Sequence, residues 1–163
     1  MSFEYAPAPE SRSIVDLKSS YGIFVDGKFS DGGGHAFKSV NPATEEVLAE
    51  YPVGGGADVD RAVAAARRAY QQVWGPMPGA QRAKYLYRIA RHIQERAREL
   101  AVLESLDNGK PIRESRDADV PLVAAWFFHY AGWADKLAHA GFGRDPRPLG
   151  VAGQVIPWNF PLL

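Results

Sequence analysis

The chain has 163 residues, no net formal charge and 46% hydrophobic residues, the profile of an ordinary globular domain with a modest core. Zero net charge and the lack of a membrane-length apolar run exclude broad electrostatic binding to nucleic acid and argue against a membrane partner. The absence of cysteine excludes disulfides, thiolate metal sites and a thiol nucleophile within these residues.

Residues 1–22 are predicted to form an N-terminal arm. Its first residues lack the basic stretch and the apolar run of a signal peptide, so we expect a cytoplasmic location. Ile14, Val15 and Leu17 are placed to dock the arm onto the body of the protein. A partly ordered tail and a structured arm are both consistent with this pattern.

Short strand patterns follow the arm. Ile23–Val25 and Lys28-Phe29 flank Asp26-Gly27, a strong signal for a tight hairpin turn. Residues 37–40 and 47–53 have the composition and period of two further strands. The sequence therefore predicts small antiparallel elements in the first third of the chain.

The three glycines at 54–56 invite comparison with a phosphate-binding loop. Their spacing is not G-x-G-x-x-G, and the lysine and hydroxyl residue of a Walker loop are missing. We interpret them as a flexible lead into a helix, with Asp58 as the predicted N-cap.

Three helices are predicted from residue 59 onward. The first ends at Gly75-Pro76, and the second carries one apolar stripe from residue 86 to residue 103 before a stop at Asn108-Gly109. Glu95 and Glu99 are interspersed among the arginines of the second helix, and the net charge is zero, which together favour a solvated face over a nucleic-acid surface.

The third helix is expected to start after Pro111 and to reach about Leu137, with a kink at Pro121. Five aromatic residues lie between positions 126 and 133. We therefore expect this helix to be largely buried, either in the core of its own domain, which is the favoured alternative, or against a partner surface. The four histidines of the chain are too dispersed to suggest a metal site.

The C-terminal part of the chain carries the pattern closest to chemistry. Residues 138–149 are rich in glycine and proline and predict a linker or a short hairpin. Residues 151–156 predict a buried strand that Pro157 ends, which places Asn159 at the carboxyl end of that strand. Its amide is able to donate to an oxyanion, although an asparagine in such a place is more typical of a turn.

Gly150–Pro161 resembles the first cofactor-domain strand and loop of the NAD(P)-dependent aldehyde dehydrogenase superfamily. Four other blocks resemble the family in the same order: Phe24–Phe29, Val40–Thr44, Leu103–Pro111 and Tyr130–Lys136. The resemblance implies an α/β fold in which β-hairpins and three long helices precede the first strand of a Rossmann-like sheet. Residues 23–137 would then begin the cofactor-binding domain, 138–149 the linker or bridging hairpin, and 150–163 a truncated strand and active-site loop.

The same resemblance implies the oxidation of a small-molecule aldehyde to a carboxylic acid with NAD or NADP. A cysteine beyond these residues would form a thiohemiacetal, and a glutamate would assist hydrolysis. Asn159 would be the catalytic oxyanion donor. The resemblance also implies a cofactor cleft lined by Ile156, Pro157, Trp158 and Asn159. It implies a substrate tunnel lined by Val120, Phe160 and Leu163. It further implies a monovalent cation site formed by Ser39, Val40 and Asp107.

Departures from the family pattern shape three expectations. The chain ends before the cysteine, so it is expected to be inactive alone and to belong to a longer protein. The resemblance implies that the full-length protein is a homodimer or a higher homo-oligomer. The short connection between Lys136 and Gly150 favours the homodimer over the tetramer that is common in the family. That connection and the arm also resemble the long branch of the superfamily, which carries a second dehydrogenase-like domain.

A non-catalytic module is the alternative. The aromatic third helix would then bind a partner, or the chain would belong to a scaffold protein that has lost its cysteine. The ordered match of five blocks favours the enzyme, while the identity of the aldehyde and the choice between NAD and NADP stay open.

Overall fold

The computed structural model describes residues 10–141, 143 and 147–163, so the predicted arm and linker lie partly outside the described residues. Within these ranges, the strands and α-helices are β1 Ile23–Val25, β2 Lys28–Ser30, β3 Ala36–Val40, β4 Val47–Pro52, α1 Gly56–Ala69, α2 Gly79–Glu95, α3 Ala97–Asn108, α4 Ile112–Glu114 and α5 Val120–Trp133. The predicted mixture of helices and strands is confirmed.

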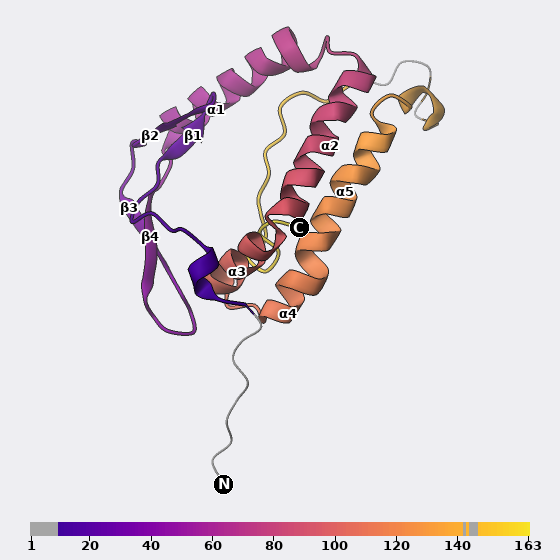
Figure 1. Ribbon diagram of the computed structural model, residues 1–163. Helices are drawn as coiled ribbons and strands as arrows, with labels where there is room; N and C mark the ends of the chain where they lie inside the picture. The colour runs from indigo at the N-terminus through magenta and orange to yellow at the C-terminus, as the bar shows by residue number, and fades with distance from the viewer. Residues whose placement is uncertain (1–9, 142, 144–146) are drawn as a thin grey trace.

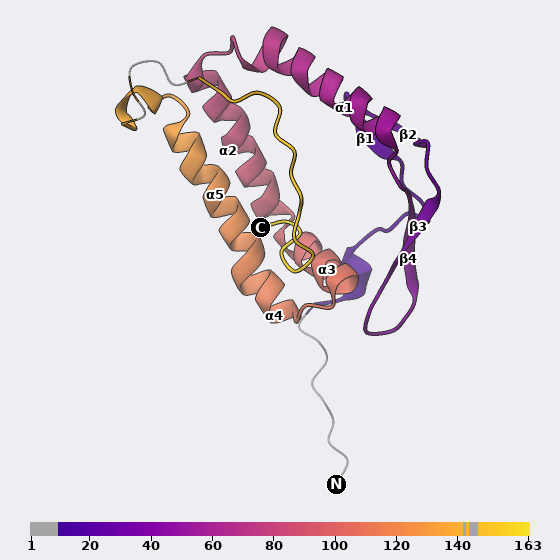
Figure 2. The same ribbon diagram turned by 180° about the vertical axis from the view of Figure 1, so that it is seen from behind.

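The elements form two groups (Figures 1 and 2). The strands and α1 lie on one side, and α2, α3 and α5 lie on the other. The C-terminal segment, yellow in both views, runs between them. None of the helices in the described part of the chain is long and apolar enough to cross a membrane.

Both predicted antiparallel pairs are present. In the β1–β2 hairpin, Asp26 and Gly27 have φ angles of 54° and 76°, as a tight hairpin turn requires. In the β3–β4 pair, a register shift between Ser39 and Val40 interrupts the ladder. Such an irregularity re-aims the side chains beside it.

The described part of the arm is attached to β4. Ser20 forms a parallel bridge with Glu50, and the Tyr21 amide donates to the Glu50 carbonyl over 3.0 Å. The rings of Tyr21 and Tyr51 stack at 5.3 Å between centroids. Residues 10–22 therefore form a structured arm, which settles one of the two alternatives for that part of the chain.

The start of α1 differs from the prediction in one detail. The helix begins at Gly56 with Gly55 as its N-cap, and Asp58 lies inside the first turn. Its carboxylate accepts from the Gly55 amide at 2.9 Å and from the Gly33 amide at 3.1 Å. The Gly55 and Gly33 hydrogen bonds, with that of Arg61, hold the pKa of Asp58 below its usual range. Asp58 is therefore not the N-cap, but its carboxylate binds the glycine-rich segments before α1 to the first turn of the helix.

Replacing Asp58 with Asn is expected to destabilise the chain at neutral pH and to matter less in acid. The carboxylate contributes stability that is fully present above its ordinary pKa of about 3.8, and this is lost as pH falls through the lower folded-state pKa. Denaturant unfolding of both proteins across pH 2–7 measures the difference. Asp60→Asn, an exposed change on the same helix, is the control. A difference that is independent of pH would contradict this account.

The predicted second helix is two helices. α2 ends at Glu95 and α3 begins at Ala97, with Arg96 outside helical geometry at φ −104° and ψ 16°. The apolar stripe crosses this bend because Ile93 and Ala101 both pack into one core cluster against α5. Periodicity reports which face is apolar and does not report a change of axis, so the bend was not predicted. The predicted stop is confirmed, since Gly109 is left-handed at φ +80°.

The predicted third helix is also interrupted. A π-helical turn, Ser115–Asp119, joins α4 to α5, and Pro121 lies in the first turn of α5. Proline has no amide hydrogen, so a wide turn just before it agrees with the expected irregularity. The α-helix ends at Trp133, short of the predicted Leu137.

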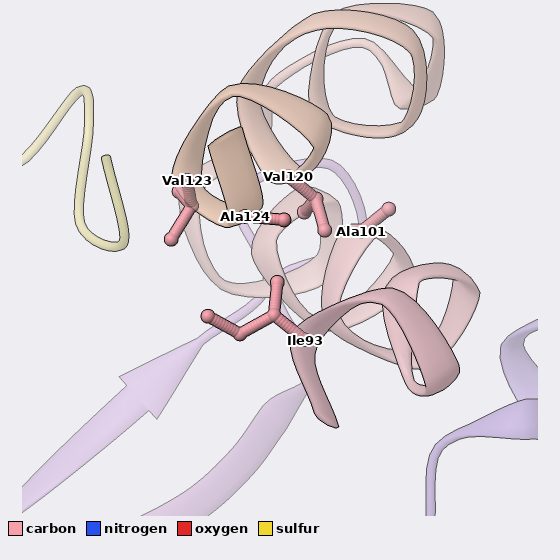
Figure 3. Packing of buried hydrophobic residues seen from close by; sticks show 5 residues of the cluster. All are labelled: Ile93, Ala101, Val120, Val123 and Ala124. Atoms are coloured by element: carbon pink, nitrogen blue, oxygen red, sulfur yellow. The ribbon is translucent and has the colours of Figure 1, made fainter. Parts of the chain in front are cut away.

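The core lies where α2, α3 and α5 meet (Figure 3). It consists of small and medium side chains, namely Ile93, Ala101, Val120, Val123 and Ala124. The favoured expectation, burial of the α5 aromatic residues in the core of this chain, is wrong for two of them, because Trp126 and Tyr130 are 47% and 58% exposed. Burial against a partner surface stays a prediction. The aromatic composition of a helix indicates that its surface is suited to burial, but it does not indicate which other residues bury that surface.

The predicted strand 151–156 is not formed. The segment is extended but has no strand partner among the described residues, and Val155 is 98% exposed. A strand requires hydrogen bonds from a neighbouring strand, and the two small sheets do not extend to this segment.

Candidate active-site turn

The candidate catalytic residue lies in a tight turn that follows the extended segment. The Phe160 amide donates to the Pro157 carbonyl over 3.2 Å, which closes the turn around Trp158 and Asn159. Asn159 is half-buried, and no hydrogen bond of its side chain is found within the described residues. Its amide group is therefore available to a ligand.

The end of α3 supports this turn from one side. The Asn108 side-chain amide donates to the Trp158 carbonyl over 2.7 Å. The Lys110 ammonium lies 4.2 Å from the centroid of the Phe160 ring, within cation–π range. Sequence reasoning did not identify these two residues as part of the site. The only signal was the block Leu103–Pro111, which resembled the family and was interpreted as a break between helices.

Lys110 belongs to a buried ionic cluster with two carboxylates. Its ammonium is 3.0 Å from a Glu104 oxygen and also contacts Asp119, and all three side chains are at least 88% buried. Burial is the main influence that raises the pKa of Glu104, against the hydrogen bond from Lys110. Burial alone would lower the pKa of Lys110, but the hydrogen bonds that its ammonium donates to Asp119 and Glu104 outweigh burial and raise that pKa. The cluster thus keeps a cation fixed beneath Phe160.

The predicted tunnel residues are only partly brought together. Leu163 lines a groove of about 460 Å³ with Val123 and Phe127 of α5. Phe160 lies over Lys110, and Val120 is 1% exposed in the core cluster. Val120 therefore cannot touch a substrate in this arrangement, because its side chain packs in the core between α3 and α5.

The predicted cation residues are brought together in part. The Ser39 hydroxyl donates to the Asp107 carboxylate, and both line a pocket of about 500 Å³ whose wall also includes Leu162. Val40 is 41% exposed and does not line that pocket. Among the described residues, no group of three or more histidine, cysteine, aspartate or glutamate side chains is arranged to hold a metal ion.

The predicted cofactor residues lie on an open surface. Trp158 is 87% exposed and Ile156 is 53% exposed, and both adjoin the turn that carries Asn159. They offer apolar surface to a flat ring. Their residue types offer no side-chain charge for a phosphate, so they fit the nicotinamide end of a dinucleotide better than its pyrophosphate.

Comparison with known proteins gives one consistent result. The profile of the aldehyde dehydrogenase family matches residues 29–163. Aminoacetaldehyde dehydrogenase of Pseudomonas aeruginosa is 43% identical over 150 residues, which cover 86% of this chain and 30% of the relative. Aldehyde dehydrogenase family 2 member B4 of Arabidopsis thaliana, a mitochondrial protein, is 41% identical over 151 residues, covering 86% of this chain and 28% of the relative.

Solved structures agree with these sequences. The NAD+ complex of an aldehyde dehydrogenase from Bacillus cereus superposes with a TM-score of 0.70 at 38% identity, covering 76% of this chain and 27% of that structure. An NAD-dependent aldehyde dehydrogenase from Sinorhizobium meliloti gives 0.71 at 34% identity, covering 86% of this chain and 29% of that structure. The chain spans about a third of the length of the curated relatives it matches.

Proposed function

Because the chain belongs to the aldehyde dehydrogenase family, we propose that it is the N-terminal segment of an enzyme that oxidises an aldehyde to a carboxylic acid with NAD or NADP. The observation that carries the proposal is the unpaired amide of Asn159, in a turn that Asn108 and Lys110 support. Overall, the aldehyde and water lose a hydride and a proton, and the carbonyl carbon gains one oxygen.

In the proposed mechanism, Asn159 acts when a nucleophile attacks the aldehyde carbon. The carbonyl π electrons move onto the aldehyde oxygen, and the Asn159 amide donates a hydrogen bond to that developing oxyanion. The nucleophile is a cysteine thiolate from outside these 163 residues, which contain no cysteine, and the adduct is a thiohemiacetal. The dinucleotide, when bound, supplies the hydride acceptor, and a glutamate from outside the chain assists hydrolysis of the thioester.

Ile156, Pro157 and Trp158 are proposed to contact the nicotinamide end of the cofactor with backbone and apolar surface. Phe160 and Leu163 are proposed to line the approach of the aldehyde, since Leu163 already forms the wall of an apolar groove on α5. Val120 is proposed only to support that wall from within the core.

Comparison of the full-length protein with the 163-residue chain tests the proposed function. We expect the full-length protein to reduce NAD or NADP in the presence of propanal, hexanal or benzaldehyde. We expect the 163-residue chain to show no turnover, because it has no thiol nucleophile. We also expect it to bind NAD weakly or not at all in calorimetry, because the residues proposed to contact the cofactor offer no charged side chain to its phosphates. A full-length protein that binds neither dinucleotide and turns over none of these aldehydes would favour the non-catalytic scaffold.

A further inference from the structure

Two side chains, one from the last residue of α3 and one from just after the helix, contact the residues on either side of Asn159. Asn108 donates to the carbonyl of Trp158 over 2.7 Å, and Lys110 lies beneath the ring of Phe160 at 4.2 Å. We propose that Asn108 and Lys110 are positioning residues that set the direction of the Asn159 amide, an inference that rests on the oxyanion role proposed above.

The two contacts hold different parts of the turn. The Asn108 bond fixes a backbone carbonyl, and therefore the peptide plane between Trp158 and Asn159. The Lys110 contact fixes a side chain on the far side of Asn159. The remaining short backbone hydrogen bond, from Phe160 to Pro157, closes the loop but does not attach it to the rest of the protein. The hydrogen bond from Asn108 and the cation–π contact from Lys110 therefore tie the turn to the C-terminal end of α3.

Lys110 is itself fixed more firmly than a surface lysine. Glu104 and Asp119 accept from its ammonium, and 12% of its side chain is exposed. A lysine normally keeps much rotamer freedom, and two buried carboxylates remove it. The ammonium then presents a permanent positive charge to the negative face of the Phe160 ring. The two carboxylates thus act on Asn159 through Lys110 and the ring.

Gly109 allows both residues to point at the same turn. Its left-handed backbone, at φ +80°, ends α3 and reverses the chain between Asn108 and Lys110. In a continued helix, residues two apart lie on different faces and could not both contact one turn. The sequence Asn108-Gly109-Lys110 therefore forms a small platform for the active-site turn.

The test is the steady-state kinetics of full-length variants with propanal and NAD. Asn108→Asp keeps the shape of the side chain but cannot donate to the Trp158 carbonyl. It is expected to lower kcat about ten-fold, as slight misplacement of a reacting group does, with KM for propanal and the Kd for NAD unchanged. The matched control is Gln94→Glu, the same amide-to-acid change on the exposed face of α2. Unchanged kcat in Asn108→Asp would overturn the inference.

A second arm examines Lys110. Lys110→Met is expected to lower kcat as Asn108→Asp does, and Lys110→Arg, which keeps a cation over the ring, is expected to restore most of it. Equal losses in the two variants would overturn the role of the charge. Lys110→Met leaves Glu104 and Asp119 buried without a positive charge between them, which can unfold the protein. In that case the kcat values of Lys110→Arg and Asn108→Asp still decide whether the two residues position the turn.

The double variant Asn108→Asp with Asn159→Ala separates this inference from the proposed function. If Asn108 acts through Asn159, the double variant is no slower than Asn159→Ala alone. Losses that multiply would show that Asn108 acts elsewhere and would overturn the inference. If Asn159→Ala alone has no effect, the oxyanion role fails, and that outcome is distinct from a failure of the platform.

Discussion

Asn159→Ala in the full-length protein is expected to lower kcat by about 10²–10³-fold, or roughly 3–4 kcal/mol of transition-state stabilisation. The amide is expected to act only when negative charge has developed on the aldehyde oxygen, so the loss falls on kcat. Cofactor affinity should survive, because Ile156, Pro157 and Trp158 remain in place. Initial rates with propanal and calorimetric titration with NAD measure the two quantities separately.

Two further variants sharpen the Asn159 experiment. Asn159→Asp has the same shape but places a carboxylate, which cannot donate, beside the oxyanion, so it should be at least as slow as the alanine variant. Gln94→Ala removes an exposed amide from α2 and should be unaffected. Full turnover in Asn159→Ala would show that the turn does not carry an oxyanion donor.

Gly109→Ala is expected to destabilise the 163-residue chain by about 2–5 kcal/mol, the sum of a left-handed backbone cost and local crowding. The backbone there is left-handed at φ +80°, and an added Cβ would lie 2.6 Å from Cγ of Pro42. Chemical denaturation followed by far-ultraviolet circular dichroism measures the free energy of unfolding.

Gly27 provides the matched control for Gly109. It has nearly the same φ, +76°, but nothing lies within 4 Å of an added Cβ. Gly27→Ala should therefore cost only the backbone part, about 1–2 kcal/mol. Pro42→Ala removes the crowding Cγ, so it should recover part of the loss when combined with Gly109→Ala. Equal losses in Gly109→Ala and Gly27→Ala would show that the Pro42 contact is unimportant.

Local features of the fold were predictable because each depends on a few neighbouring residues. Asp26-Gly27 specified a tight hairpin, and Gly109 specified the end of a helix, since both positions need a positive φ that other residues adopt at a cost. The family itself was recognised through runs of consecutive residues, and the oxyanion role of Asn159 within the last of these runs stays a prediction. These predictions needed no knowledge of which segments meet in space.

Features that depend on distant partners were missed or wrong. Val120 was expected at the substrate but is buried against Ile93 and Ala101, which lie on two other helices. The strand 151–156 was expected to be buried, and it is exposed because no described strand pairs with it. Backbone hydrogen bonds and side-chain cover come from across the fold, which a local pattern does not contain.

The sequence by itself determined the α/β class, the hairpins, the helix stop at Gly109 and the resemblance to a family of aldehyde-oxidising enzymes. Only the tertiary structure decided what surrounds Asn159. Glu104, Lys110 and Asp119 are separated by up to fifteen residues along the chain and come together because the chain reverses at Gly109 and α5 folds back along α2. The position of the Lys110 ammonium beneath the ring of Phe160, fifty residues further along, is a consequence of packing. Electrostatic contacts of this kind depend on distance in space, and composition and periodicity carry no measure of it.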